Sequence, residues 1–299
     1  MPLFSALVFN NEALKTLVPT IAAAFAIQAA VAIPSIWSQN EQYYDLSGSA
    51  TFLACTALSL YMPVIRTRAY AASHGLPKPA FPSLTSFGYN KLVLSAMVAV
   101  WAGRLGTFLF ARIKKAGKDP RFDDIKPKPL LFFGAFMAQA TWVSLVAGPV
   151  FAVNAIPKAS LPALGVLEGF GILVWLFGMS FEITADRQKS TWRAQKDAKK
   201  HSETFISSGL WSRTRHPNYF GESTLWVGMS IFAYRSLSKV RYYPSYAGYL
   251  AFVAPAFVTL LTQFVSGTPM LEKKNDKELG ADWQEYKKKT PVFFPKLGL

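Results

Sequence analysis

The chain has 299 residues, of which 51% are hydrophobic and only 16% are charged. Soluble domains carry about 25% charged residues, so this composition favours a membrane protein over a soluble globular one. The formal net charge of +15 suits a nucleic-acid partner, but the basic residues gather in loops between apolar runs rather than on one soluble face. We therefore expect no nucleic-acid binding.

Apolar runs recur along the chain, and a helix that crosses a bilayer needs about 20 such residues. In chain order the runs are Leu14–Trp37, Leu46–Ile65, Lys91–Phe110, Leu130–Val153, Leu161–Phe181, Tyr219–Tyr234 and Ser245–Val265. The sixth run is short and carries Glu222, so it suits a tilted helix or one that starts inside a cavity. We predict an all-α fold, a polytopic transmembrane bundle of about seven helices with a cytosolic C-terminal segment.

Basic residues concentrate in three polar stretches that alternate correctly for one side of a membrane. They are Arg112–Arg121, Arg187–Arg215 and Lys287–Lys289, which the positive-inside rule assigns to the cytosol. The loop that carries Arg66, Arg68 and Lys78 then lies on the opposite side, contrary to the same rule.

Some polar features favour a structural role. Within the apolar runs, the amides Gln28, Gln139 and Gln263 are expected to hydrogen-bond between helices. The segment Gly117–Asp123 predicts an ordered cytosolic turn that pairs with other loops. The single cysteine, Cys55, permits no intrachain disulfide.

The segment Arg213–Glu222 joins a group of polar side chains to an apolar run. Pro217 suits the first turn of a helix because its missing N–H costs nothing there. The free N–H groups and positive dipole end of such a helix suit an anionic ligand. Asn218 and Glu222 lie four residues apart, so they share one helix face. A carboxylate one turn into an apolar segment needs a polar partner, and we predict a phosphate-bearing ligand here.

A second charged stretch follows the fifth run without proline or glycine, so we expect that helix to continue out of the bilayer. The spacing of Glu182, Asp186, Lys189 and Arg193 makes one helical stripe. Such a stripe is ordinarily a solvated surface, but Glu182 stands directly behind the apolar run, which favours function.

The two stretches together could line a single cleft that includes Arg215, His216 and Asn218. Carboxylates and amides suit ribose hydroxyls, whereas arginines suit phosphates. A backbone hydrogen bond at the helix entry is the simpler alternative for His216. No second histidine or cysteine lies at ligand spacing, so we predict no metal site. The fingerprint of a Rossmann fold is absent from the sequence, and helices must therefore hold any cofactor.

Several spaced motifs occur in order between Trp101 and the C-terminus. They are Trp101…Arg104-Leu105, Asp119-x-Arg121-Phe122-Asp123, Glu182-x-x-Ala185-Asp186-x-Gln188-Lys189, Gly209-Leu210-Trp211, Arg215-His216-Pro217-Asn218-Tyr219-Phe220-Gly221-Glu222 and Ser266-Gly267…Leu271-Glu272. Through these motifs the chain resembles the steroid 5-alpha-reductase-like membrane proteins, in particular the DUF1295 branch. The resemblance implies NADPH bound from the cytosolic side and reduction of a carbon–carbon double bond conjugated to a carbonyl in a steroid, sterol, polyprenal or enoyl lipid.

The resemblance also assigns residues and regions. The expected cofactor-binding residues are Glu182, Asp186, Arg193, Arg215, His216 and Asn218, and the expected catalytic residues are Glu222 and Tyr219. We expect one integral membrane domain over 1–299, with N-terminal helices on the substrate side in 1–100 and the cofactor-binding region in 101–299. The expected partners are a lipid substrate from the bilayer and membrane lipids, in the endoplasmic reticulum. The oligomeric state is not indicated.

One departure from the resemblance keeps other functions open. In steroid reductases a tyrosine and a polar pair on early helices hydrogen-bond the substrate carbonyl, whereas Trp101 occupies the matching position near Arg104. Tyr61 and Tyr89 are the remaining candidate donors. A lipid- or nucleotide-binding membrane protein without activity is therefore one alternative.

A second alternative arises from the motif Arg-His-Pro-x-Tyr-x-Gly, which is also similar to that of isoprenylcysteine and phospholipid methyltransferases. Those enzymes use S-adenosylmethionine. Glu222 and the stripe that begins at Glu182 favour the reductase over this class.

Overall fold

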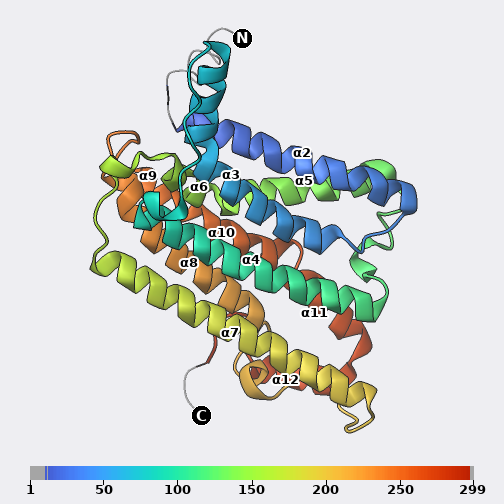
Figure 1. Ribbon diagram of the computed structural model, residues 1–299. Coiled ribbons are helices and arrows are strands. Elements are labelled where there is room, and N and C mark those ends of the chain that lie inside the picture. Colours follow the sequence, from blue (N-terminus) through green and yellow to red (C-terminus); the bar gives the residue numbers. More distant parts are fainter. Residues whose placement is uncertain (1–10, 12, 297–299) are drawn as a thin grey trace. The chain divides into compact units, whose positions relative to one another are not determined.

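The computed structural model describes residue 11 and residues 13–296, and within these it contains helices and no strand (Figure 1). The chain forms two compact units. Unit 1 comprises 1–165 and 232–251, and unit 2 comprises 166–231 and 252–299. The single-domain organisation stays a prediction.

Unit 1 is built from five longer elements and several short ones. The longer elements are α2 (Leu14–Ser38), α3 (Tyr44–Ser73), α4 (Tyr89–Ala116), α5 (Pro129–Val146) and α6 (Gly148–Ala155). The short ones are η1 (Leu84–Ser86), η2 (Pro120–Phe122), η3 (Lys158–Ser160) and α9 (Ala247–Leu250). α3 packs against α2 and α4, and α5 packs against α2. The fourth apolar run is thus two helices rather than one, because Pro149, in the first turn of α6, lacks the N–H that would continue α5.

The interior of unit 1 combines aromatic packing with hydrogen bonds between helices. The Phe52 ring meets the rings of Trp101 and Trp142 edge-on, with centroids 5.0 Å apart in both pairs. The Gln28 amide donates to Thr51 Oγ1 at 2.7 Å, and the Gln139 amide donates to the Tyr44 carbonyl at 3.0 Å. The prediction that Gln28 and Gln139 hydrogen-bond between helices is confirmed.

An ionic cluster in unit 1, called here the loop cluster, consists of Glu41, Asp45, Asp119, Arg121 and Lys126. The Arg121 guanidinium donates to both Asp45 and Asp119, at 3.0 and 2.6 Å. Glu41 accepts from the Asp119 backbone N–H at 2.8 Å and from Lys126 Nζ at 3.1 Å. The predicted ordered turn at Gly117–Asp123, paired with another loop, is therefore confirmed.

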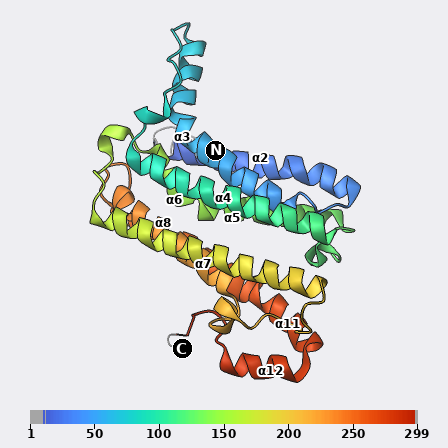
Figure 2. The same cartoon turned by 60° about the horizontal axis from the view of Figure 1, so that its bottom comes forward.

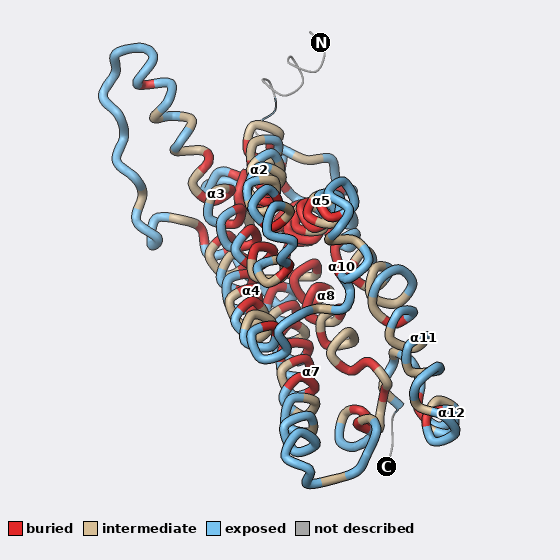
Figure 3. The backbone as a smooth tube through the Cα atoms, turned by 90° about the vertical axis from the view of Figure 1, so that its right-hand side faces the viewer, coloured by how far each residue is buried: buried red, intermediate tan, exposed pale blue. Residues whose placement is uncertain are grey.

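Unit 2 contains α7 (Val166–Asp197) and α8 (Pro217–Ser238), of which residues 217–231 belong to this unit. It further contains η4 (Gly209–Ser212), α10 (Val253–Leu260), a π-helical turn η5 (Leu261–Val265), α11 (Thr268–Glu278) and α12 (Gly280–Lys289). α7 runs well past Phe181, and Figure 3 shows its C-terminal end mostly exposed. Its continuation as a helix beyond the apolar run is confirmed.

Six helical segments of the described residues are long and apolar enough to cross a membrane. They are Leu14–Ser38, Tyr44–Ser73, Tyr89–Ala116, Pro129–Val146, Val166–Asp197 and Ala247–Glu278. The expected count of about seven included the run that forms α8, which is not among these six. Large apolar side chains such as Leu130, Leu173 and Phe177 are exposed on these helices, as expected of surfaces that face lipid.

Candidate functional site

α7 and α8 approach each other so closely that their backbones touch. A methyl group at Gly221 would lie 2.6 Å from Glu182 N and 2.8 Å from Gly178 O. One at Gly228 would lie 2.5 Å from Trp175 N. As the numbers rise along α8 they fall along α7, so the two helices are antiparallel. Small residues at such contacts are a common means of packing helices in membranes.

This glycine contact determines where the acidic stripe of α7 lies. Glu182 is level with Gly221, and both Glu182 and Asp186 are buried. Because the helices are antiparallel, residues after Glu182 approach the beginning of α8, where Asn218 lies in the first turn. Arg193, two turns beyond Asp186, is exposed. The structure thus brings Glu182 and Asp186 to the first turns of α8, whereas Arg193 extends past them.

The segment before α8 is held against α7 by contacts from its own motif, Gly209-Leu210-Trp211. Gln188 Oε1 accepts from the Leu210 backbone N–H at 2.9 Å. The Trp211 indole donates to the Ala185 carbonyl at 3.1 Å, and Lys189 Nζ lies 4.4 Å from the centre of the Trp211 ring. These contacts place residues 209–216 beside the stripe.

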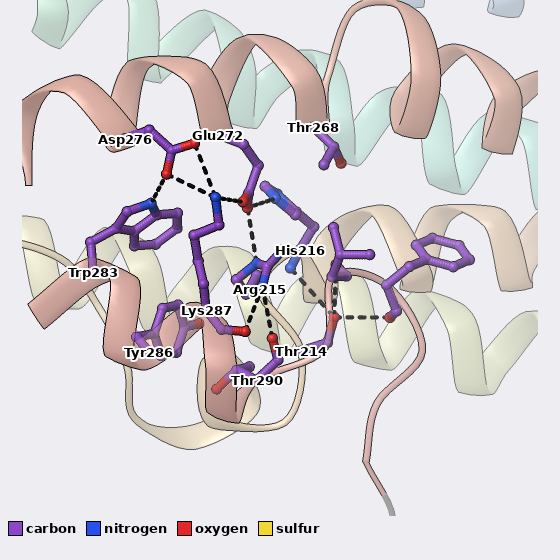
Figure 4. Close-up of polar contacts among 12 residues, drawn as sticks. Thr214, Arg215, His216, Thr268, Glu272, Asp276, Trp283, Tyr286, Lys287 and Thr290 are labelled. Carbon is purple, nitrogen blue, oxygen red and sulfur yellow. Dashed lines mark hydrogen bonds and ion pairs between the residues drawn. The ribbon is translucent and has the colours of Figure 1, made fainter. Parts of the chain in front are cut away.

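A second ionic cluster, called here the Arg215 cluster, consists of Arg215, His216, Glu272, Asp276 and Lys287 (Figure 4). Arg215 Nε donates to Glu272 Oε1 at 3.0 Å, and Arg215 Nη1 donates to the Lys287 and Thr290 carbonyls, at 3.0 Å each. Lys287 Nζ donates to Asp276 at 2.8 Å. Arg215 therefore holds α11 and the end of α12, with only 12% of its side chain exposed.

Backbone contacts extend this attachment to the last described residues. Arg215 N–H donates to the Pro291 carbonyl at 2.9 Å, and Lys296 N–H donates to the Arg213 carbonyl at 3.0 Å. Thr214 Oγ1 donates to the Phe293 carbonyl at 2.9 Å. Residues 291–296 thus run back along residues 213–215.

His216 lies at the centre of the Arg215 cluster. Its Nε2 is 3.0 Å from Glu272 Oε1, and because an ionised carboxylate only accepts, Nε2 is the donor. Burial lowers the pKa of His216, the charges of Lys189 and Arg215 lower it further, and the bond to Glu272 opposes them. The imidazole is therefore neutral at physiological pH. Its ring stacks on Tyr219, with centroids 5.4 Å apart and 9° between the planes.

The π-helical turn η5 lies against the same end of α8. A methyl group at Gly267, just after the turn, would lie 2.9 Å from the Tyr219 ring. Gln263, within the turn, accepts from Thr268 Oγ1 at 3.1 Å. Its Nε2 is buried and finds no acceptor among the residues that the structure describes. π-Helical turns inside α-helices are frequent at functional sites, because they redirect side chains.

The predicted residues fall into two groups. Glu182 and Asp186 meet the beginning of α8, which carries Asn218, Tyr219 and Glu222. Arg215 and His216 are engaged by Glu272 and by the chain end instead, so their role toward a cofactor stays a prediction. Glu272 was not among the predicted site residues, although the motif Ser266-Gly267…Leu271-Glu272 contained it. A carboxylate just after a membrane-length run was the available signal.

The candidate donors from the first half of the chain lie in unit 1. Trp101 is buried in the aromatic interior, and Tyr61 packs against Phe81 and Phe87. Tyr89 is 74% exposed at the start of α4. Within the described ranges, no group of three or more His, Cys, Asp or Glu side chains is placed to hold a metal.

These features identify an all-helical, integral multi-pass membrane protein. In unit 2 it carries a cluster of charged residues at the start of α8. The chain belongs to the DUF1295 family, described as proteins of unknown function, whose family model matches residues 76–290. No curated protein and no solved structure matches it.

Proposed function

We propose that this protein is a membrane oxidoreductase that uses NADPH to reduce a carbon–carbon double bond conjugated to a carbonyl in a lipid. One observation carries the proposal: the backbone contact between α7 and α8 brings the buried carboxylates Glu182 and Asp186 to the first turns of α8. Buried carboxylates at the end of an apolar helix are costly, and they are typical of functional sites in membranes.

The residues present fit a dinucleotide. Glu182 and Asp186 suit ribose hydroxyls, and the exposed Arg193 suits a phosphate. The N-terminus of α8, at Pro217, supplies the positive end of a helix dipole. The buried Nε2 of Gln263 needs an acceptor, which a carboxamide or phosphate oxygen would supply. Arg215 and His216, which both hydrogen-bond Glu272, hold the segment just before this helix end in place.

The chemistry requires a hydride and a proton. NADPH, held by Glu182, Asp186 and Arg193, would supply a hydride to the carbon β to the carbonyl. A hydrogen-bond donor must stabilise the negative charge on the carbonyl oxygen, and the α-carbon then takes a proton. We assign these proton-handling roles to Tyr219 and Glu222. Tyr219 is oriented for this by stacking on His216 and by contact with Gly267.

The setting proposed for this reaction is an endoplasmic-reticulum-type membrane with the C-terminus in the cytosol. Exposed apolar side chains on the helices suit a substrate that arrives from the bilayer. The basic stretches that favour a cytosolic placement include Arg187–Arg215, which borders the site.

The test is a comparison of ligand-induced melting shifts for the purified protein in a mild detergent. NADPH is expected to raise the melting temperature more than NADH does, and S-adenosylmethionine is expected to leave it unchanged. Asp186→Asn and Arg193→Gln should each weaken NADPH binding by about tenfold, the usual effect of losing one charge-assisted hydrogen bond. Arg187→Gln, an exposed neighbour outside the stripe, is the matched control and should bind like wild type.

A clear shift with S-adenosylmethionine, beside unchanged melting with NADPH, would overturn the proposal in favour of a methyltransferase. If NADPH binds, turnover is measured as oxidation of NADPH with a long-chain enal in the same detergent. Glu222→Gln should lower that turnover, and wild-type turnover would exclude Glu222 from the reaction. Binding without turnover on any enone or enal lipid would identify a non-catalytic nucleotide-binding protein.

A further inference from the structure

Unit 1 contains a cavity that none of the site residues above line. It has a volume of about 300 Å³ and lies between the C-terminal half of α3, the start of α4 and the end of α6. The segment 82–88 closes one side of it, and Phe87 of that segment packs against Tyr61 with ring centroids 5.1 Å apart. Figure 2 shows the C-terminal part of α3 extending at this end, followed by the chain that returns to α4.

Three cationic side chains line this cavity: Arg66, Lys91 and Lys158. Lys91 is only 5% exposed, and its Nζ donates to the Asn154 carbonyl at 2.8 Å. An ammonium group has three hydrogens to donate, and the described residues offer Lys91 this one neutral acceptor. A buried cation is costly unless an anion pairs with it, so the cavity favours an anionic ligand.

The rest of the cavity wall is largely apolar. Leu60, Val64, Phe87 and Ile156 contribute hydrocarbon surface next to the cations. Lys158 also helps to close the cavity, since its Nζ donates to the Ser86 carbonyl at 2.9 Å. Apolar walls around a charged end are suited to an amphiphile, with its head group at the lysines and its chain along the wall.

The positive-inside rule does not explain why these cations lie at this end of α4. α4 has 28 residues and is therefore about 42 Å long, and the cavity and the loop cluster lie near its opposite ends. The positive-inside rule accounts for basic residues at only one end. If the cations at the cavity were only surface charges, their position would contradict that rule. Binding a ligand would explain why they lie there.

We infer that this cavity binds the carboxylate or phosphate head group of a single-chain anionic lipid, with Lys91 as its principal cationic contact. The head group would neutralise Lys91 and accept hydrogen bonds from it. The first part of the acyl chain would lie along the apolar wall.

The test is equilibrium binding of radiolabelled oleate and of lysophosphatidic acid to the full-length protein in a non-ionic detergent. At least one of the two should bind saturably. Lys91→Met should weaken that binding at least about tenfold, because one buried charge-assisted hydrogen bond is lost. Lys78→Met is the matched control: Lys78 is exposed on the same side and does not line the cavity, so wild-type affinity is expected.

Competition separates a lipid from a small anion. Oleyl alcohol, which has the same chain without the charge, should compete at least about tenfold more weakly than oleate. Millimolar acetate and inorganic phosphate should not displace the lipid. Equal binding by wild type and Lys91→Met, equal competition by the alcohol, or displacement by acetate or phosphate would each overturn the inference. Lys158→Met, whose side chain is exposed, provides a second variant should Lys91→Met fail to fold, and it too should weaken binding.

Discussion

The loop cluster of unit 1 and the Arg215 cluster of unit 2 both use an arginine to hold a connecting segment, but in different surroundings. Arg121 is 46% exposed and binds two carboxylates, Asp45 and Asp119. Arg215 is 12% exposed and binds one carboxylate and two backbone carbonyls. An ion pair with an exposed member contributes little because water already solvates that charge, whereas a broken buried pair leaves an unsolvated charge behind. Arg121 and Arg215 should therefore contribute very differently to the free energy of unfolding.

The largest expected effect is that of Arg215→Met. The substitution leaves Glu272 without its guanidinium and removes the donor to the Lys287 and Thr290 carbonyls. We expect a loss of about 3–5 kcal/mol in the free energy of unfolding, as for other broken buried pairs. Denaturant titration of the detergent-solubilised protein measures it. Arg213→Met, two residues earlier, is the control and should stay near wild type.

Arg121→Met should have a much smaller effect in the same titration. Its pairs are partly solvated, so we expect a loss of about 1 kcal/mol or less. A loss as large as that of Arg215→Met would break the comparison, and would show that solvent exposure does not determine the strength of these clusters.

The stability of the two clusters should also depend on pH in different ways. This is the smallest of the expected effects, and it vanishes at neutral pH. The folded protein holds the pKa of His216 below 6.5, so its contribution is complete above that pH and is lost as the pH falls through the lowered value. Burial raises the pKa of Glu41, but hydrogen bonds from Asp119 and Lys126 outweigh it and bring the pKa below 4.5. The contribution of Glu41 to the loop cluster should therefore be lost only in stronger acid.

Melting curves between about pH 7 and pH 5 sharpen this contrast, since histidine titrates in that range. His216→Gln should flatten the decline seen in wild type, whereas Glu41→Gln should not alter its shape. An unchanged decline in His216→Gln would contradict the assignment of that step to His216.

Much of the fold was accessible from the sequence because long apolar runs leave a chain few alternatives in a membrane. The start of α8 at Pro217 and the continuation of α7 to Asp197 followed from local rules. The division of Leu130–Val153 into α5 and α6 depended on the position of Pro149, which hydropathy does not register.

The candidate site was accessible only in part. The approach of Glu182 to Gly221 agrees with the predicted convergence of the stripe and α8. The engagement of Arg215 by Glu272 and by the Thr290 carbonyl could not be foreseen, because it joins residues more than fifty positions apart and uses backbone atoms that carry no sequence signal.

The return of the chain end to residues 213–215 has a consequence for biosynthesis. The carbonyls of Lys287, Thr290, Pro291 and Phe293 emerge from the ribosome after every apolar helix has entered the translocation machinery. Until then the Nη1 and the backbone N–H of Arg215 and the hydroxyl of Thr214 lack these acceptors, so this segment completes its folding only after residues 287–293 have been made. Nascent chains stalled before Lys287 should accordingly be more open to protease near Arg215 than released chains that contain residues 287–296.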